Sequence, residues 1–302
     1  LDVTEVPEEV YNNLIEAVHA NMDKMCRYVA LRKKLLGVDG LHMYDVYTPI
    51  VADADSEITY EEAKATVLEA LAVLGEDYTD LLKEGFANRW IDVYENTGKR
   101  GGAYSSGNSY PHPYVLLNHK DNLDSMFTLA HEMGHALHSY HSCKYQPVNT
   151  AAYVIFVAEV ASTCNEVLLM RHLLGKTTDK KQRAYLINHF LEQFRTTLYR
   201  QTLFAEFERK AHDLYAAGQP LTATSLNKAY HDLEATYYDG IGIDADIDPE
   251  WSYVPHFYRA FYVYQYATGF SSAVAIAEHI LTTGDASGYL KFLTTGGSDY
   301  PL

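Results

Sequence analysis

Apolar residues recur every three to four positions along most of the chain, which is the pattern of amphipathic helices. The pattern predicts helices over residues 7–36, 59–82, 179–217 and 222–238, and a last long helical run that begins near Trp251. We therefore expect a mainly α-helical fold.

The ends of these segments carry residues that start and stop helices. Pro7 is followed by two acids, which suit a first helical turn, and Gly37 follows the last apolar position of that segment. Thr59 precedes Glu61 and Glu62, which predicts an N-cap followed by an acidic first turn. The boundaries therefore agree with the periodicity.

One interval departs from the helical spacing. Between residues 90 and 118 the apolar spacing shortens, four glycines accumulate and prolines flank His112. These features are typical of short strands and turns. We expect a small β-sheet or hairpin near residues 90–118 inside a helical body.

The chain has no internal repeat, low-complexity linker or shift in composition that would mark a second domain. Its 302 residues can bury a sizeable core. We expect residues 1–302 to form a single α-rich domain. Because the sequence starts at Leu1 rather than at Met and ends abruptly at Leu302, we also expect a piece of a longer chain.

Composition narrows the classes of partner. The net charge is −16 at pH 7, and no basic cluster exceeds short fragments such as residues 32–34, so nucleic acid and anionic membranes are not expected partners. Three cysteines without a C-x-x-C pattern indicate neither a disulfide framework nor a thiolate metal site, and they fit a cytoplasmic location. The longest apolar run, residues 151–158, is too short to span a bilayer.

The segment with the clearest chemistry is an H-E-x-x-H pattern at residues 131–135. On a helix, His131 and His135 lie on one face and can bind one zinc ion, while Glu132 stands beside the open coordination position. An N-cap at Asp121 or Asn122 supports the helix. The alternative is that both histidines are hydrogen-bonded structural residues.

A catalytic zinc site needs a third protein ligand. Glu159 stands alone in an apolar stretch of the next helical segment, where an unpaired buried carboxylate is costly, so zinc is its expected partner. Glu166 follows two turns later on the same face and is a candidate hydrogen-bond partner for a ligating histidine. A solvent-exposed position for Glu166 is an equal alternative.

Other histidines compete for the third position. His138, His141 and His172 are the candidates, but three histidines at positions 131, 135 and 138 of one straight helix cannot converge on a tetrahedral ion. We therefore place His138 in the outer shell of the site or in a structural role.

The last candidate segment, residues 255–269, is rich in aromatic side chains. His256, Tyr258 and Tyr262 repeat near one helical turn behind a proline and can project donors toward a developing oxyanion. For Tyr264 and Tyr266, packing in the core is an equal alternative.

These motifs together resemble the oligoendopeptidase F group of the thimet-oligopeptidase-like zinc metallopeptidases. The likeness extends along nearly the whole chain. The matching segments are residues 131–135, 156–163 and 256–269, together with residues 92–96, 102–105 and 194–197.

The resemblance implies a helical, zincin-like metallopeptidase lobe with one Zn²⁺ held by His131, His135 and Glu159. It implies Glu132 as general base and places an oxyanion-stabilising and substrate-binding role at residues 256–262. It also implies that an edge strand lies against the peptide backbone. The residues expected in that strand are Gly102, Ala103, Tyr104 and Ser105.

The implied activity is hydrolysis of internal bonds in short unstructured peptides. Members of the family are about twice as long, so the resemblance implies the C-terminal catalytic part of a chain whose N-terminal helical lobe is missing. Two alternatives stay open: a zinc metallocarboxypeptidase, since other helical H-E-x-x-H peptidases also use a later Glu, and a peptide-binding lobe without catalysis.

Overall fold

The computed structural model describes residues 6–51, 57–107 and 111–299. Both chain ends, on which the expectation of a truncated chain rests, lie outside these residues. The chain divides into two compact units: Leu1–Ala52 with Asn188–Thr268, called unit 1, and Asp53–Ile187 with Gly269–Leu302, called unit 2. A single domain over residues 1–302 stays a prediction.

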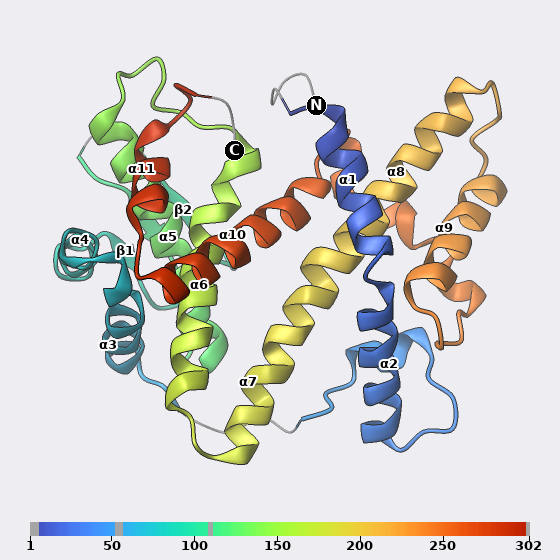
Figure 1. Cartoon of the computed structure of the whole chain (residues 1–302), viewed down its shortest axis with the longest axis horizontal. Coiled ribbons are helices and arrows are strands. Elements are labelled where there is room, and N and C mark those ends of the chain that lie inside the picture. The colour runs from blue at the N-terminus through green and yellow to red at the C-terminus, as the bar shows by residue number, and fades with distance from the viewer. Residues whose placement is uncertain (1–5, 52–56, 108–110, 300–302) are drawn as a thin grey trace. The chain divides into compact units, whose positions relative to one another are not determined.

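Unit 1 is built from helices. They are α1 (Glu8–His19), α2 (Met22–Leu36), the end of α7 (Lys180–Gln193), a π-helical stretch (Phe194–Tyr199), α8 (Arg200–Ala216), α9 (Ala223–Tyr237) and the first turn of α10 (Tyr264–Thr283). Short 3-10 helices occupy Met43–Tyr47, Ala245–Ile247, Glu250–Tyr253 and Pro255–Tyr258. Helices α1 and α9 both pack against α8 (Figure 1).

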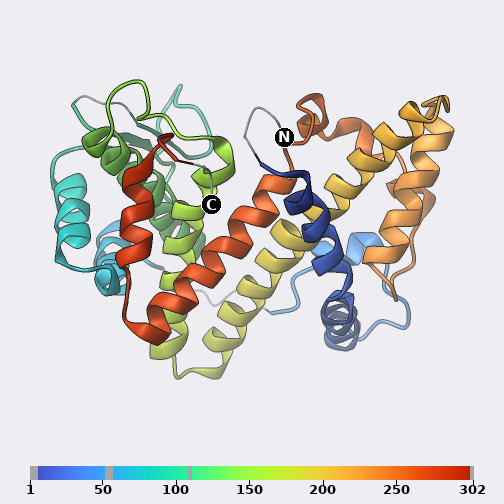
Figure 2. The ribbon, with the colours of Figure 1, turned by 45° about the horizontal axis from the view of Figure 1, so that its top comes forward.

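Unit 2 contains helices and a small sheet. Its helices are α3 (Tyr60–Ala70), a 3-10 turn (Leu71–Leu74), α4 (Glu76–Ala87), α5 (Leu123–Tyr145), α6 (Ile155–Lys176), the start of α7, the rest of α10 and α11 (Ser287–Thr295). Helix α5 packs along α6, and α3, α4 and α11 also contact α5 (Figures 1 and 2). Fully buried side chains such as Leu129, Met133 and Val160 fill the interface of this group.

The sheet in unit 2 confirms the expectation for residues 90–118. It contains β1 (Ile91–Asp92), β2 (Tyr104–Ser106) and β3 (Tyr114–Leu116) in the order β1-β3-β2. Strand β1 runs parallel to β3 and β2 runs antiparallel to it. In the part of the chain that the structure describes, β2 is therefore an edge strand.

Two of the expected helices are interrupted. The first breaks between α1 and α2, where the backbone of Asn21 leaves helical geometry with φ −116° and its side-chain amide donates to the Ala17 carbonyl oxygen at 2.9 Å. The segment at 59–82 breaks at Gly75, which has φ +95°. The predicted ends are confirmed at Gly37, which has φ +68°, and at Thr59, whose side chain forms a capping box with Glu62.

The last helical run does not begin near Trp251. Two short 3-10 helices occupy that region, and the long helix α10 begins only at Tyr264. Pro255 and a positive φ of 54° at Phe261 keep the chain out of a continuous helix.

Two expectations from composition can be compared with the fold. All three cysteines are free, and Cys164 is buried. In the described ranges, no helix combines the length and the apolar character that a membrane span requires.

Candidate metal centre

Helix α5 presents His131 and His135 on one face. Its start is fixed by Asn122, whose side chain accepts a hydrogen bond from the Ser125 backbone N–H at 2.9 Å, so the predicted cap is present. Buried apolar residues of α5 face the core, and the two imidazoles lie edge to face with ring centroids 4.7 Å apart. Their Nε2 atoms are 3.1 Å apart.

Helix α6 brings Glu159 to the same point. Its Oε2 lies 3.5 Å from His131 Nε2 and 3.6 Å from His135 Nε2. Ligands bound to zinc at about 2.0–2.2 Å with tetrahedral angles lie roughly 3.3–3.6 Å from one another. The three atoms therefore have the chemistry and nearly the spacing of a zinc ligand set, and each residue is only partly buried.

Glu166 lies against the outer nitrogen of His131. Its Oε1 is 2.5 Å from His131 Nδ1. Burial alone lowers the pKa of His131, but Glu166, Glu159 and Glu132 outweigh it and raise that pKa to about 9. For His135, burial and the neighbouring His131 lower the pKa to about 3, so this ring is neutral. The cluster is rich in negative charge.

Glu132 points a buried carboxylate into the same region. Its Oε2 has no hydrogen-bond partner among the described residues. Burial, with Glu159 and Glu166, raises the pKa of Glu132 to about 7, against the opposing effects of His131 and a backbone hydrogen bond from Ser105. A carboxyl group with a pKa near neutrality is suited to accept and return a proton.

The competing histidines lie in other environments. His138 is buried, and its ring stacks on Tyr153 at 3.8 Å. His141 Nδ1 donates to the Leu137 carbonyl oxygen at 2.7 Å, and His172 lies 3.7 Å from a carboxylate oxygen of Glu69. The structure groups none of these three with the described metal-ligand atoms, and an outer-shell role for His138 stays a prediction.

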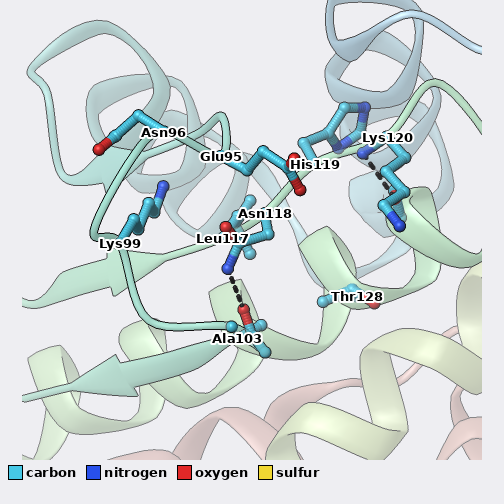
Figure 3. Close-up of a pocket in the computed structure, with 12 residues that line it drawn as sticks. Glu95, Asn96, Lys99, Ala103, Leu117, Asn118, His119, Lys120 and Thr128 are labelled. Carbon is cyan, nitrogen blue, oxygen red and sulfur yellow. Dashed lines mark hydrogen bonds between the residues drawn. The ribbon is translucent and has the colours of Figure 1, made fainter.

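The residues expected to hold a peptide backbone lie at the start of β2. Gly102 has φ +87°, which only glycine adopts easily. The Asn118 side-chain amide donates to the carbonyl oxygen of Arg100 at 2.9 Å and to that of Gly102 at 2.8 Å (Figure 3). Lys99 Nζ donates to the Tyr94 carbonyl oxygen at 2.7 Å. The loop that enters the edge strand is thus held in one conformation.

A polar cavity of about 550 Å³ lies beside this loop (Figure 3). The loop before β2, the segment after β3 and the first turns of α5 line it, including Ala103, Asn118 and Thr128. Thr128 precedes His131 by one helical turn on the same face of α5. The cavity and the metal-ligand cluster therefore share helix α5, although none of the three ligand residues lines the cavity.

The aromatic segment at 255–269 begins in unit 1 and is not the expected helical repeat. The His256 ring stacks on Tyr262 at 5.8 Å, and the hydroxyl of Tyr262 lies 3.0 Å from that of Tyr266. Tyr258 is 91% exposed. The Phe261 N–H donates to Glu208 Oε1 at 2.6 Å and stabilises the turn with positive φ. Catalytic roles for His256, Tyr258 and Tyr262 stay predictions.

The sequence reasoning missed residues that support this site. Asn165 is fully buried; its side chain donates to the Ala130 carbonyl oxygen at 3.1 Å and accepts from the Tyr78 hydroxyl at 3.0 Å. An amide inside an apolar helix was the available signal, because buried amides require partners. Tyr264 is buried, as the core alternative expected.

Comparison with known proteins gives consistent matches over the chain. The model of peptidase family M3 matches residues 2–302. Oligopeptidase PepF of Bacillus subtilis is 52% identical over 300 residues, which cover 98% of this chain and 45% of that protein. The chromosomal oligoendopeptidase F of Lactococcus lactis subsp. cremoris is 46% identical over 303 residues, with 98% and 50% covered.

A solved structure agrees with these sequence matches. The crystal structure of oligoendopeptidase-F from Enterococcus faecium has a TM-score of 0.75 at 38% identity, covering 99% of this chain and 47% of that one. The chain spans about half the length of the curated relatives it matches.

Proposed function

The chain belongs to peptidase family M3, and on that premise we propose that it carries the catalytic site of a zinc metalloendopeptidase that cuts internal bonds of short peptides. The observation that carries the proposal is the convergence of three ligand atoms, from His131, His135 and Glu159, at the spacing of a zinc ligand set. Glu132 lies on α5 with the two histidines, and its Oε2, which has no hydrogen-bond partner among the described residues, would act as the base.

Glu166 would prepare His131 for the metal. When Nδ1–H of His131 donates a hydrogen bond to Glu166, the lone pair of the ring is on Nε2, which faces the other two ligand atoms. The same hydrogen bond fixes the orientation of the ring. Glu166 is therefore proposed as the outer-shell partner of the site.

Glu132 would move the proton in the reaction. Zinc, when bound, supplies a Lewis acid that polarises the scissile carbonyl and makes a water molecule more acidic. Glu132 Oε2 takes the proton of the attacking water and returns it to the departing amine. The raised pKa of Glu132 fits a group that must both accept and release a proton.

His256, Tyr258 and Tyr262 would stabilise the negative charge on the substrate oxygen. The stacked pair of His256 and Tyr262 supplies ordered donors, and the exposed Tyr258 is free to contact a peptide. Loss of one such donor typically lowers the rate about 10²–10³-fold.

The edge strand β2 would hold the peptide. Pairing through main-chain hydrogen bonds tolerates many sequences, which fits short unstructured peptides of varied composition. The substrate-binding residues proposed are Gly102, Ala103, Tyr104 and Ser105. Since the relatives are about twice as long, we also propose that a further helical lobe completes the protein. The cysteines of this chain fit a cytoplasmic location.

An internally quenched peptide blocked at both ends tests the function, together with measurement of bound zinc. We expect one zinc per chain and cleavage within the peptide that a chelator abolishes and added zinc restores. Cleavage of unblocked peptides only, one residue at a time from the C-terminus, would indicate a carboxypeptidase. Peptide binding without zinc and without cleavage would indicate a peptide-binding lobe and contradict the proposal.

A further inference from the structure

Gly134 of α5 lies directly against the backbone of α6. It lies between the two histidines of the metal-ligand cluster. A Cβ atom at this position would lie 2.6 Å from Ser162 Cα, 2.8 Å from the Ala161 carbonyl oxygen and 3.0 Å from Ser162 N. These are main-chain atoms, so no side-chain rotation relieves the contact, and only a glycine allows the two helices to approach this closely.

A second glycine contacts α6 at Glu159 itself. A Cβ atom at Gly269 of α10 would lie 3.3 Å from the Cβ of Glu159 and 3.9 Å from the backbone nitrogen of Val160. The contact is tighter than ordinary van der Waals contact but less severe than the one at Gly134, because 3.3 Å requires a shift of only a few tenths of an ångström. Helix α6 therefore meets a glycine on each of two neighbouring helices within one turn of Glu159.

The size of the displacement decides whether the metal site would tolerate a methyl group. Carbon atoms pack at about 3.5–4.0 Å, so an alanine at position 134 requires α5 and α6 to separate locally by roughly 1 Å. Metal–ligand distances tolerate only about ±0.2 Å. A shift of that size would withdraw Glu159 from His131 and His135.

We propose that Gly134 and Gly269 are positioning residues of the metal centre: the absence of side chains there sets the distance between α5 and α6 that brings Glu159 to the two histidines. The inference rests on the proposed zinc site and adds to it the feature of the fold that fixes the third ligand. Glycine is a poor helix former compared with alanine, so a glycine in the middle of α5 is explained by this close approach.

The chain offers a matched control. Gly175 lies in α6, and a Cβ atom there would meet no atom within 4 Å. All three substitutions, Gly134→Ala, Gly269→Ala and Gly175→Ala, add one methyl group to a helix and raise its helical propensity. The three variants differ only in the atoms that the added methyl group contacts. A difference in zinc affinity between them therefore measures the effect of that contact.

Zinc dissociation constants of the whole chain, measured by competition with a chromophoric chelator, test the inference, with circular dichroism as the measure of folding. We expect zinc binding to weaken roughly 100-fold in Gly134→Ala and roughly 10-fold in Gly269→Ala, and to stay unchanged in Gly175→Ala. The visible spectrum of the Co²⁺-loaded Gly134→Ala and Gly269→Ala proteins should change in the way expected for loss of a protein ligand.

If Gly134→Ala fails to fold, the Gly269→Ala protein carries the test. Wild-type zinc affinity and an unchanged Co²⁺ spectrum in the folded glycine variants would overturn this inference alone. A wild-type chain that binds no zinc would overturn the proposed function and this inference with it.

Discussion

The ion-paired acids Glu250 and Glu192 of unit 1 differ from the acids at the metal-ligand cluster of unit 2 in the groups that surround them. In unit 1, Glu250 is 4% exposed and is paired with the Arg200 guanidinium and the Tyr230 hydroxyl. Glu192 in the same unit is paired with Arg32 and Arg195. Arginines of the same unit therefore neutralise Glu250 and Glu192.

Unit 2 gathers acids without such compensation at its metal-ligand cluster. The ion pairs recorded for Glu159 within the described ranges are both with histidines. Burial together with neighbouring acids raises the pKa of Glu132 to about 7. Acids that are paired with arginines, as in unit 1, stabilise the fold. Acids that converge with imidazoles, as in unit 2, are suited to binding a metal cation.

Replacement of Glu159 by Ala tests the unit 2 side of the comparison and has the largest expected effect. Zinc affinity should fall more than about 100-fold, because removal of an outer-shell partner already costs 10–100-fold. Unfolding of the metal-free protein should occur at the same or a higher denaturant concentration, because one carboxylate leaves a crowded cluster. Wild-type zinc content in Glu159→Ala would remove Glu159 from the ligand set.

The matched change in unit 1 is Glu250→Ala. It leaves Arg200 buried without its partner, so the free energy of unfolding should fall by about 3–5 kcal/mol. Zinc affinity of the folded protein should not change. Denaturant unfolding and zinc titration should show that Glu159→Ala loses zinc affinity but not stability, and that Glu250→Ala loses stability but not zinc affinity. A Glu250→Ala protein with weaker zinc affinity and unchanged stability would contradict the comparison.

Glu166→Ala tests the comparison at an acid that is not itself a proposed ligand but contacts Nδ1 of the proposed ligand His131. The expected result is a 10–100-fold weaker zinc affinity with the fold retained, since His131 loses the partner of its Nδ1 atom. Zinc titration in competition with a chelator measures the change in zinc affinity. A zinc affinity within threefold of wild type would place Glu166 outside the site.

Replacement of Glu234 in unit 1 has the smallest expected effect on stability, and that effect depends on pH. Burial and the neighbouring Glu250 raise the pKa of Glu234 to about 7, against the lowering effects of Tyr230 and nearby arginines. The folded state therefore holds a proton that the unfolded state, with a pKa of about 4.3, releases. The stability gained from this proton is full below about pH 4 and is lost as the pH rises through 7.

Glu234→Gln mimics the protonated side chain at every pH. Urea unfolding should show it about 1–3 kcal/mol more stable than wild type at pH 8, with the difference shrinking toward pH 5. An advantage that is equal at both pH values would contradict the buried, proton-binding environment assigned to Glu234.

Local signals in the sequence were enough to predict the helix that carries the two histidines and the small sheet beside it. The four-residue spacing of His131 and His135, the cap at Asn122 and the glycines around the small sheet each depend on neighbours along the chain, and the structure contains all three features. Glu159 was predicted as a third ligand because a lone acid in an apolar helix requires a partner, and its carboxylate lies beside both histidines.

Features that depend on distant contacts were not predictable in the same way. The turn at Phe261 has a positive φ without a glycine and is held by Glu208, more than fifty residues earlier, so the periodicity of residues 256–262 indicated a helix that does not form. The break before α2 depends on the Asn21 side chain competing for a backbone carbonyl. The close approach at Gly134 needs the position of α6, which no local pattern gives.

The central claim is that the cluster in unit 2 binds zinc and that Glu132 moves the proton. Its most direct test is Glu132→Gln, with bound zinc and cleavage of an end-blocked peptide measured on the same preparation. One zinc per chain, as in the wild type, with turnover about 10²–10⁴-fold slower, is the predicted result. Wild-type turnover in Glu132→Gln would contradict the claim.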